Sequence, residues 1–175
     1  MKYRFCPQCG SPLVLKKKSN GEQAYLTCSK CGFVHYNNPK PCVSAVIIRN
    51  GKVLLMKRAY EPFKNHWDYP GGFLESGENP QEGLRREVVE ELKINVEIID
   101  FLGIYPDTYG PEGDATLNIY YLCKISNGTI DPQAEVAEAR WFVLNDLPQK
   151  LAFGHVKLVL DEWRKIERRN EPIFL

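Results

Sequence analysis

Runs of apolar residues separated by polar turns predict a β-sheet in the middle of the chain. The runs at 43–49 and 52–58 are joined by Asn50-Gly51, a pair that is typical of the two-residue turn of a β-hairpin. Further strand-like runs lie at 96–105, 116–125 and 138–144. Strands followed by a helix, more strands and a closing helix predict a mixed sheet covered by helices, in the α/β class.

Two segments have the apolar spacing of amphipathic helices. The first opens with a start signal, since Asn79 is suited to cap the helix, Pro80 to occupy its first position and Glu82 to reach back to the cap. We expect this helix over about residues 80–92, with a buried stripe of Leu84, Val88 and Leu92. The second helix is expected within 154–169, where the apolar positions are Val156, Val159, Leu160, Trp163 and Ile166.

Four of the six cysteines have the spacing of a metal site. They form two Cys-x2-Cys pairs separated by eighteen residues: Cys6, Cys9, Cys28 and Cys31. Each pair is followed by a glycine that permits the turn of a zinc knuckle, and Asn20-Gly21 between the pairs predicts a hairpin. Residues 3–35 therefore resemble a zinc ribbon, in which four thiolates would hold a structural Zn²⁺. Two disulfides are the alternative, but nothing in the sequence indicates an oxidising compartment.

The remaining cysteines, Cys42 and Cys123, stand outside this spacing and are expected to be buried free thiols. The stretch 36–41 contains two prolines and two asparagines, which predicts a linker. We therefore expect a ribbon domain at 1–37 and a main domain at 38–175.

Composition and charge narrow the functional classes. The 175 residues are 43% hydrophobic and 26% charged, which is typical of a globular protein. No run reaches the roughly 20 apolar residues that cross a membrane, and the start lacks a secretory apolar core, so we expect a cytoplasmic protein. The formal net charge of +1 gives no basic excess to favour nucleic acid. Lys16-Lys17-Lys18 near Tyr25 leaves such a contact open beside simple solvation.

The first helix concentrates carboxylates beside its apolar stripe. Glu87, Glu90 and Glu91 lie at spacings of three and four, so their side chains converge on one side of the helix. Like charges at this spacing disfavour an isolated helix, and Gly83 on the same side costs it roughly 1 kcal/mol relative to alanine. A hard divalent cation would explain the cluster, and close approach by another group would explain the glycine. A solvated face held by Glu and Arg pairs is the alternative.

With these residues the chain resembles the Nudix family, over roughly residues 42–165. The Nudix box, G-x5-E-x7-R-E-U-x-E-E-x-G-U with U apolar, is matched in register over 23 residues, except that Lys93 stands where the pattern has a glycine. Because that glycine normally ends the helix, we expect the turn out of the helix to be made differently. The matching positions are Gly72, Glu78, Arg86, Glu87, Val88, Glu90, Glu91 and Ile94.

The resemblance implies an α/β/α sandwich and a hydrolase that cleaves a nucleoside diphosphate linked to another group. The implied cofactor is Mg²⁺ or Mn²⁺, which would neutralise charge on the pyrophosphate and activate a water. By this resemblance the metal would be held by the Gly72 carbonyl and by Glu87, Glu90 and Glu91.

The same resemblance implies roles for the neighbouring charged residues. Arg86 would orient a glutamate, and Glu78 would assist from the loop before the helix. The general base would be Glu91 or Glu135. Glu135 and Glu138 resemble acidic positions that many members place before a late tryptophan, with a solvated acidic loop as the alternative.

The substrate follows from the architecture that the chain resembles. A ribbon ahead of a Nudix domain is similar to NADH pyrophosphatases, but their Ser-Gln-Pro-Trp-Pro motif is absent after the box. The resemblance therefore implies ADP-ribose or FAD, with NADH or a nucleoside triphosphate as alternatives. A regulatory protein that binds nucleic acid through the ribbon is a hypothesis of another class, which the intact glutamates disfavour. Members of the family are commonly homodimers, although no interface can be identified in the sequence.

Aromatic and basic residues supply candidates for substrate contact. Phe63 and Tyr105 belong to the aromatic set that could stack a base, and Lys57 could meet phosphate. Trp67 and Tyr69 fit the core equally well, and strand-end solvation explains Lys57 and Arg58 equally well. The three histidines, His35, His66 and His155, are expected at the surface or in the core. The substrate-binding candidates are Arg58, Trp67, Tyr69, Tyr109 and Glu135.

Overall fold

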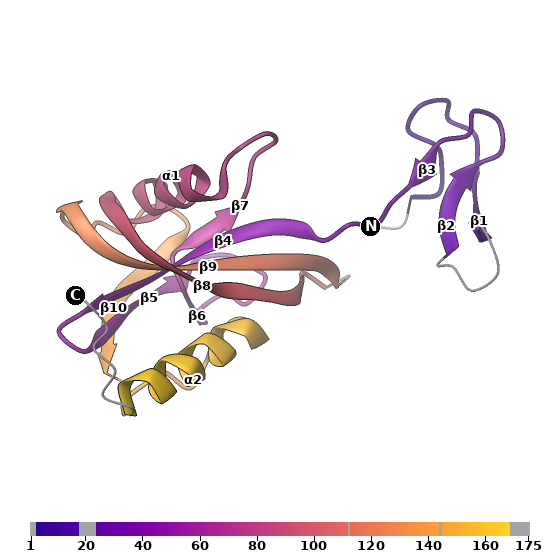
Figure 1. Ribbon diagram of the computed structural model, residues 1–175. Coiled ribbons are helices and arrows are strands. Elements are labelled where there is room, and N and C mark those ends of the chain that lie inside the picture. The colour runs from indigo at the N-terminus through magenta and orange to yellow at the C-terminus, as the bar shows by residue number, and fades with distance from the viewer. Residues whose placement is uncertain (1–2, 18–23, 112, 144, 169–175) are drawn as a thin grey trace. The chain divides into compact units, whose positions relative to one another are not determined.

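The computed structural model describes residues 3–17, 24–111, 113–143 and 145–168, without the side chains of 165–168. The chain forms two compact units, Met1–Pro39 and Lys40–Leu175. The described part of the first unit contains β1 (Leu13–Lys17), β2 (Ala24–Cys28) and β3 (Val34–His35). The second unit (Figure 1) contains β4 (Lys40–Arg49), β5 (Lys52–Arg58), β6 (Trp67–Asp68), β7 (Gly71–Phe73), α1 (Pro80–Leu92), β8 (Ile94–Tyr109), β9 (Asp114–Gly128), β10 (Val136–Val143) and α2 (Gly154–Arg168).

The first unit is an antiparallel sheet in the order β1-β2-β3, with the cysteine pairs on two tight turns. Gly10 and Gly32 take the left-handed conformation, with φ of 69° and 77°. Their amides donate to the carbonyls of Cys6 and Cys28, so both knuckles close in the same way. This confirms the predicted ribbon. Two other predictions lie outside the described residues: the Asn20-Gly21 turn and Lys18.

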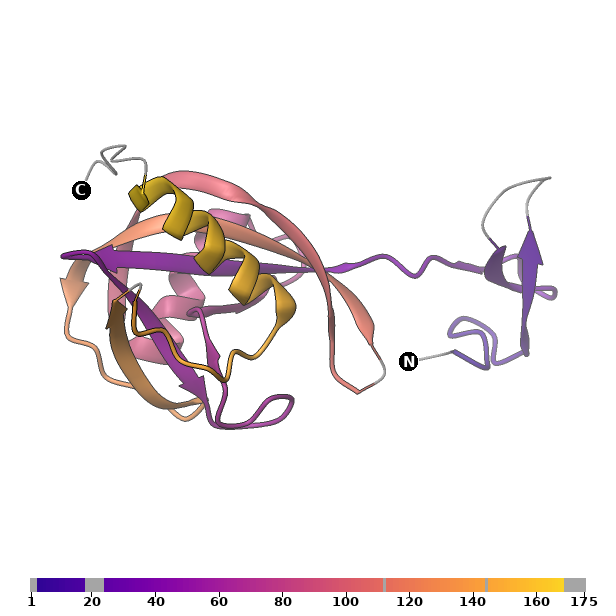
Figure 2. The same ribbon diagram turned by 90° about the horizontal axis from the view of Figure 1, so that it is seen from below.

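The second unit is built on one mixed sheet. Its strands follow the order β10-β5-β4-β9-β8, with β6 paired to β5 and β7 to β4. β4 and β9 run parallel, and the other neighbours run antiparallel. The two helices cover opposite faces of this sheet (Figures 1 and 2). The arrangement confirms the predicted α/β/α sandwich with a mixed sheet.

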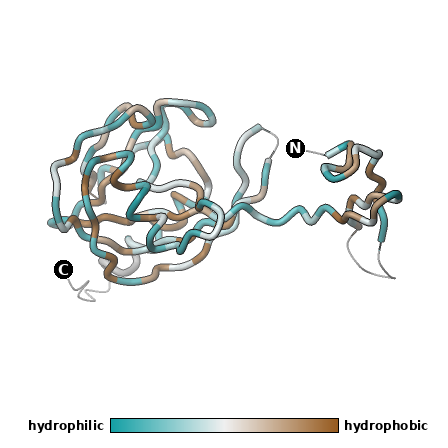
Figure 3. The backbone as a smooth tube through the Cα atoms, turned by 90° about the horizontal axis from the view of Figure 1, so that it is seen from above, coloured by the Kyte–Doolittle hydropathy of each residue, from teal (hydrophilic) through white to brown (hydrophobic). Residues whose placement is uncertain are grey.

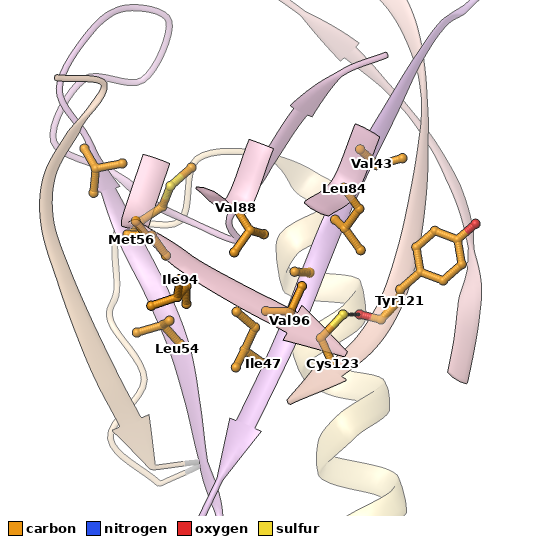
Figure 4. Close-up of a cluster of buried hydrophobic side chains, with 13 residues drawn as sticks. Val43, Ile47, Leu54, Met56, Leu84, Val88, Ile94, Val96, Tyr121 and Cys123 are labelled. Atoms are coloured by element: carbon orange, nitrogen blue, oxygen red, sulfur yellow. Dashed lines mark hydrogen bonds between the residues drawn. The ribbon is translucent and has the colours of Figure 1, made fainter. Parts of the chain in front are cut away.

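Alternation along β4 divides the core between the two faces. Ala45 and Ile47 pack on the side of α1, whereas Val46 and Ile48 pack on the side of α2. The predicted apolar stripe of α1 is fully buried against the first side (Figure 4): Leu84, Val88 and Leu92.

The closing helix α2 covers the second face with the predicted stripe. Its buried members are Val156, Val159, Leu160 and Trp163, and the side chain of Ile166 lies outside the described part of the chain. Among the described residues, no helix combines the length and apolarity needed to cross a membrane.

The hairpin between β4 and β5 forms as predicted. Arg49 pairs with Lys52, and the two turn residues have positive φ, 53° at Asn50 and 68° at Gly51. Positive φ at both central residues is the pattern of a type I′ turn, whose twist matches that of the flanking strands. The predicted strands at 96–105 and 116–125 also form, and they extend further as β8 and β9.

Two segments predicted to be irregular are so only in their first part, at residues 36–39 and at Pro70, and belong to strands in the rest. The stretch at 36–41 is hydrophilic (Figure 3), but Lys40 and Pro41 already pair within β4. The predicted loop Pro70-Gly71-Gly72 is wrong in its second half, because Gly71 and Gly72 pair with β4 as part of β7. A Cβ atom on Gly71 would lie 2.0 Å from the Val43 carbonyl oxygen, so only glycine allows this close pairing.

Both ends of α1 are defined by backbone geometry. The Asn79 side chain accepts a hydrogen bond from the Gln81 amide at 2.9 Å, which confirms the predicted cap. At the other end Lys93 has φ of 55° and ψ of 28°, and its amide donates to the Val89 carbonyl at 3.0 Å. The expectation of a different turn is wrong, because the lysine adopts the left-handed conformation that the glycine of the pattern would take.

We predict that Lys93→Gly stabilises the protein. A non-glycine residue in the left-handed region costs the folded state about 1–2 kcal/mol, and glycine removes this cost. Glycine also raises the conformational entropy of the unfolded chain, which offsets about half of the gain in stability. A gain of about 0.5–1 kcal/mol in the free energy of unfolding should appear in denaturant titrations.

Lys93→Ala is the matched control, because it removes the same charged chain and retains the Cβ atom. It should stay within about 0.5 kcal/mol of the parent protein. Equal stability of the glycine and alanine variants would contradict the strain at residue 93.

Candidate active site

The buried stripe of α1 places its glutamates beside β7. Glu91 is itself buried, and its Oε2 accepts a hydrogen bond from the Gly71 amide at 2.8 Å. Burial raises the pKa of Glu91 well above its usual range, against the effect of the Gly71 hydrogen bond, and the nearby charges of Glu87, Asp68 and Glu135 add to the rise. The surroundings of the Glu91 carboxyl group thus supply negative charge and too little positive charge to balance it.

Glu87 lies against the backbone of β7. A Cβ atom on Gly72 would be 2.6 Å from the Glu87 carboxylate, so the glycine leaves the space that this carboxylate fills. Burial raises the pKa of Glu87, and the charges of Glu90 and Glu135 act in the same direction against the neighbouring Arg86. The structure therefore brings the Gly72 backbone and the α1 glutamates together.

Arg86 connects these glutamates to the loop before the helix. Its Nε and Nη2 donate to the two oxygens of Glu78 at 2.8 and 2.9 Å, a bidentate pair. Nη1 donates to Glu87 at 2.9 Å and to Glu90 at 3.2 Å, and Nη2 also donates to the Phe73 carbonyl. Hydrogen bonding to Arg86 lowers the pKa of Glu78 to about 2. One guanidinium thus fixes the positions of three carboxylates.

Gly83 leaves room for the same loop. A Cβ atom there would lie 2.5 Å from Cδ2 of Leu74 and 2.7 Å from Oε2 of Glu78. The close approach predicted at this glycine is therefore made by the chain itself. Substitution would displace Glu78 from the position in which it pairs with Arg86.

A cleft of about 450 Å³ opens beside the glutamates. Glu135 lies in the segment before β10 and lines the same cleft as Glu87 and Glu91. Arg58 and Tyr109 line it as well, from the ends of β5 and β8. The cleft thus combines four carboxylates with a guanidinium and an aromatic ring: Glu87, Glu90, Glu91, Glu135, Arg58 and Tyr109.

Arg58 is held firmly at the edge of this cleft. Its Nε donates to the Pro62 carbonyl at 2.8 Å, and its Nη1 lies 3.3 Å from Oδ2 of Asp68. The guanidinium lies 5.3 Å from the ring centre of Phe153 and 6.0 Å from that of Tyr109. Among the described residues it is the one Arg or Lys that lines the cleft.

The other aromatic candidates lie elsewhere. Trp67 is buried with its ring 4.7 Å from that of Phe142 and lines neither the cleft nor the pocket described next, so it has a core role. Tyr69 is almost fully buried against Tyr120 and lines the pocket described next, not the cleft. Tyr105 bonds to Glu162 of α2 through its hydroxyl.

Several charged candidates are engaged in pairs outside the cleft. Lys57 pairs with Glu138 and lies over the Trp67 ring at 4.7 Å, and Glu138 also pairs with Arg140.

Phe63 is half-exposed and packs edge-on against Phe153. Cys42 and Cys123 are buried free thiols, as predicted.

A second, smaller pocket adjoins the cleft, and sequence analysis missed most of it. It shares Arg58, Gly71, Gly72, Phe73 and Tyr109 with the cleft. Its other polar residues come from separate strands and loops, so no local motif marks them. The one signal was a polar residue within the apolar run at 116–125. That residue is Asn118, which is buried and lines the pocket with Asp68 and His155.

In the first unit, the four predicted cysteines converge. Their sulfur atoms all lie within 4.8 Å of one another, with Cys6 and Cys31 at 3.5 Å and Cys9 and Cys28 at 3.5 Å. Four thiolates around Zn²⁺ at about 2.3 Å would lie about 3.8 Å apart, so the set fits a tetrahedral ion. Hydrogen bonds with Ser11 lower the pKa of Cys9 to about 6, whereas, against a backbone hydrogen bond, the neighbouring thiols raise the pKa of Cys31 to about 12, because four thiolates this close repel one another without a cation.

Elsewhere in the described residues, no further set of three or more His, Cys, Asp or Glu ligand atoms converges in this way. The α1 glutamates have different hydrogen-bond donors: Arg86 donates to Glu87 and Glu90, and the Gly71 amide donates to Glu91. The donor set is nevertheless suited to a hard cation, because it consists of crowded carboxylates of which two have raised pKa values.

Comparison with protein families gives two matches that together span most of the chain. Residues 38–161 match the NUDIX domain, and residues 4–37 match the Nudix N-terminal zinc ribbon.

Curated relatives match over the same region. The chain is 37% identical over 131 residues to an ADP-ribose pyrophosphatase of Methanocaldococcus jannaschii, covering 74% of this chain and 76% of that protein. It is 31% identical over 162 residues to an NAD-capped RNA hydrolase, NudC, of Vibrio atlanticus, covering 91% of this chain. The chain spans only 56% of the length of the Vibrio protein.

A solved structure has a similar fold over nearly the whole chain. A NUDIX hydrolase from Nitrosomonas europaea matches with a TM-score of 0.82 and 29% identity, covering 99% of this chain and 97% of that one.

We predict that the cysteine cluster binds about one Zn²⁺ per chain. Replacing Cys28 and Cys31 together by serine should abolish zinc binding and unfold the first unit, because metal binding supplies on the order of 10 kcal/mol to such small domains. Zinc content by elemental analysis and amide hydrogen exchange of residues 3–17 and 24–35 would measure both effects.

Cys123→Ser is the matched control, since Cys123 is a buried free thiol of the second unit. It should retain the metal. Zinc-free wild-type protein, purified without chelators and still protected from exchange in the first unit, would contradict the prediction.

Proposed function

Because this chain belongs to the Nudix family of hydrolases, we propose that it cleaves the pyrophosphate of a nucleoside diphosphate linked to another group, with ADP-ribose as the preferred substrate. The observation that carries the proposal is the 450 Å³ cleft with glutamates on α1 and Arg58 at its edge. The substrate preference is supported by the name of the archaeal relative, which the chain covers over 76% of its length.

Glu87, Glu90, Glu91 and the Gly72 carbonyl would hold a divalent cation, Mg²⁺ or Mn²⁺. When bound, such a cation neutralises the charge that develops on pyrophosphate oxygens and makes a coordinated water more acidic. The bidentate pair of Arg86 with Glu78 keeps the guanidinium anchored to the loop, so Arg86 positions Glu87 and Glu90 without serving as a ligand.

Glu91 or Glu135 would take the proton from the attacking water. Glu91 is buried at the base of the cleft, and Glu135 lies in the segment before β10 that lines it. Their charges influence each other, since Glu135 adds to the rise in the pKa of Glu91. Both line the cleft that would hold the substrate, which supports each as a candidate for the base.

Arg58 and Tyr109 are the substrate contacts that the geometry supports. Arg58 presents a permanent positive charge at the edge of a carboxylate-rich cleft, which suits a substrate phosphate. Tyr109 lies beside it with a ring that can stack on a base. Trp67 is buried in the aromatic core, which leaves it a supporting role, whereas Tyr69 is buried but lines the smaller pocket beside the cleft.

A second candidate substrate is NADH or an NAD-linked end. The similarity to the Vibrio NAD-capped RNA hydrolase extends over 91% of this chain and includes the ribbon. The absence of the Ser-Gln-Pro-Trp-Pro motif weighs against this candidate.

The proposed domain division places the ribbon at 1–37 and the hydrolase domain at 38–175. It is supported by the two compact units, which separate between Pro39 and Lys40, and by the two family matches, which meet at residues 37 and 38.

We expect Mg²⁺-dependent turnover of ADP-ribose in a panel that also contains NADH, FAD, dinucleoside polyphosphates and deoxynucleoside triphosphates. Glu90→Gln and Glu91→Gln should each lower kcat by about 100-fold or more, because a carboxamide cannot replace the charge that a metal ligand or base supplies. Steady-state assays of the AMP released from ADP-ribose, together with ribose 5-phosphate, would measure the loss. Glu135→Gln, assayed beside them, would report whether Glu135 or Glu91 acts as the base.

Glu82→Gln provides a matched control, because Glu82 lies on the exposed side of the first turn of α1. It should retain wild-type kcat. The proposal fails if no compound in the panel is hydrolysed or if the Glu90 and Glu91 variants equal the wild type.

A further inference from the structure

The smaller pocket beside the cleft gathers nearly all the buried polar side chains of the described residues. Glu91 is the exception, and it lines the cleft instead. A protein interior does not concentrate polar groups in one place without a partner for them, because each unpaired group costs free energy. The five polar residues that line this pocket are Ser44, Asp68, Thr116, Asn118 and His155, each at most 8% exposed.

The hydrogen bonds already made leave this pocket rich in acceptors. Asn118 donates through Nδ2 to the Tyr105 carbonyl at 3.0 Å and to Thr116 Oγ1 at 3.1 Å, so its amide oxygen is the atom left for a ligand. Asp68 accepts from the Tyr69 amide and from Arg58, which hold its carboxyl as a fixed acceptor. A ligand that fits these atoms must bring hydroxyl or amine protons.

His155 is oriented to take part in the same recognition. Its Nδ1 lies 2.8 Å from Oδ2 of Asp107, and its backbone amide donates to the same oxygen at 3.1 Å. With a proton on Nδ1 held by Asp107, the other ring nitrogen, Nε2, can accept from a ligand. Tyr69 also lines the pocket, and its hydroxyl is buried without a hydrogen-bond partner among the described residues. The pocket thus holds oriented acceptors, and one of the aromatic residues that line it has a buried, unsatisfied hydroxyl.

The size of the pocket limits what can enter. Its volume is about 50 Å³, whereas a cavity that holds a benzene ring measures about 150 Å³. It has room for one or two hydroxyl groups and none for a purine or nicotinamide ring. Because it shares Arg58 and the Gly71–Phe73 strand with the cleft, a group in it lies next to a phosphate held at the edge of the cleft.

We propose that this pocket, lined by Asp68, Asn118 and His155, binds the cis-diol of a sugar that is joined to the substrate phosphate, and that it selects ribosylated substrates over those without a diol. The inference rests on the proposed function for the placement of the phosphate. ADP-ribose contains two riboses, one on each side of the pyrophosphate. Both carry a cis-diol, so either ribose could occupy the pocket.

Binding of single phosphorylated sugars to the metal-free, full-length protein tests the pocket without turnover. Two pairs of probes differ only in the diol: 1,4-anhydroribitol 5-phosphate against tetrahydrofurfuryl phosphate, and AMP against 2′,3′-dideoxy-AMP. At least one diol-bearing member should bind about tenfold or more tightly than its partner, because acceptors built for hydroxyls are left unpaired by the analogue. In NMR titrations the ring signals of His155 should shift with the diol-bearing ligand only. The pair that shows the preference identifies the ribose.

Asn118→Leu and Asp68→Asn should each reduce this preference toward equal affinity, whereas His66→Phe, outside the pocket, should retain it and helps to assign the histidine signals. The wild-type comparison needs no variant, so a variant that fails to fold leaves the test intact. Equal affinities in both pairs, no saturable binding of either pair, unmoved His155 signals, or a preference that persists in folded pocket variants would overturn the proposal.

Measurements of hydrolysis rates distinguish a failure of this proposal from a failure of the proposed function. The kcat/KM for ADP-ribose should exceed that for an analogue lacking the selected diol by about tenfold or more, and the two pocket variants should lose most of that ratio. If the protein hydrolyses none of these compounds but still binds the diol-bearing probes preferentially, the proposed function fails and the diol pocket stands.

Discussion

The close approach of β7 to both β4 and α1 is the constraint on which the candidate active site depends. A Cβ atom on Gly71 would lie 2.0 Å from the Val43 carbonyl oxygen, and one on Gly72 would lie 2.6 Å from the Glu87 carboxylate. The pair of glycines therefore lets one short strand touch the central sheet on one side and the glutamates on the other. The same strand donates its Gly71 amide to Glu91 and separates the cleft from the smaller pocket. The core supports this contact, since the fully buried leucines and valine of α1 fix the height of the helix over the sheet.

The charge distribution follows from that contact. Burial against β7 raises the pKa of Glu87 and Glu91, and the crowding of like charges adds to the effect. Arg86 balances part of this negative charge, but its bidentate bond commits it to Glu78. A cluster that is costly in isolation is thus kept by the packing around it, as is common where a site needs a cation. The solvated-face alternative does not account for Glu91, which is only 7% exposed.

The sequence predicted the features that depend on neighbours along the chain, and it failed where contacts between distant segments decide. The start of α1 and its buried stripe follow from Asn79-Pro80 and the 3.6-residue period, and the structure reproduces the range 80–92. β7 was missed because two glycines look like a loop until β4 is beside them. The diol pocket was missed because Asp68, Asn118 and His155 come from β6, β9 and the start of α2. Lys93 shows a third kind of failure, in which the backbone conformation is kept although the residue that favours it is gone.

The two units differ in what holds them together, so the metals proposed for them would have different roles: one would stabilise the fold, and the other would serve chemistry alone. Among the described residues of the first unit, the buried apolar side chains are Cys6 and Cys28, two of the proposed zinc ligands. A domain of this size has little other core, so its stability has to come from coordination. The second unit instead buries apolar residues on both faces of its sheet, and its glutamates lie at the edge of that core. A divalent cation held by these glutamates, as we propose, would therefore serve the chemistry, and its removal would leave the fold intact.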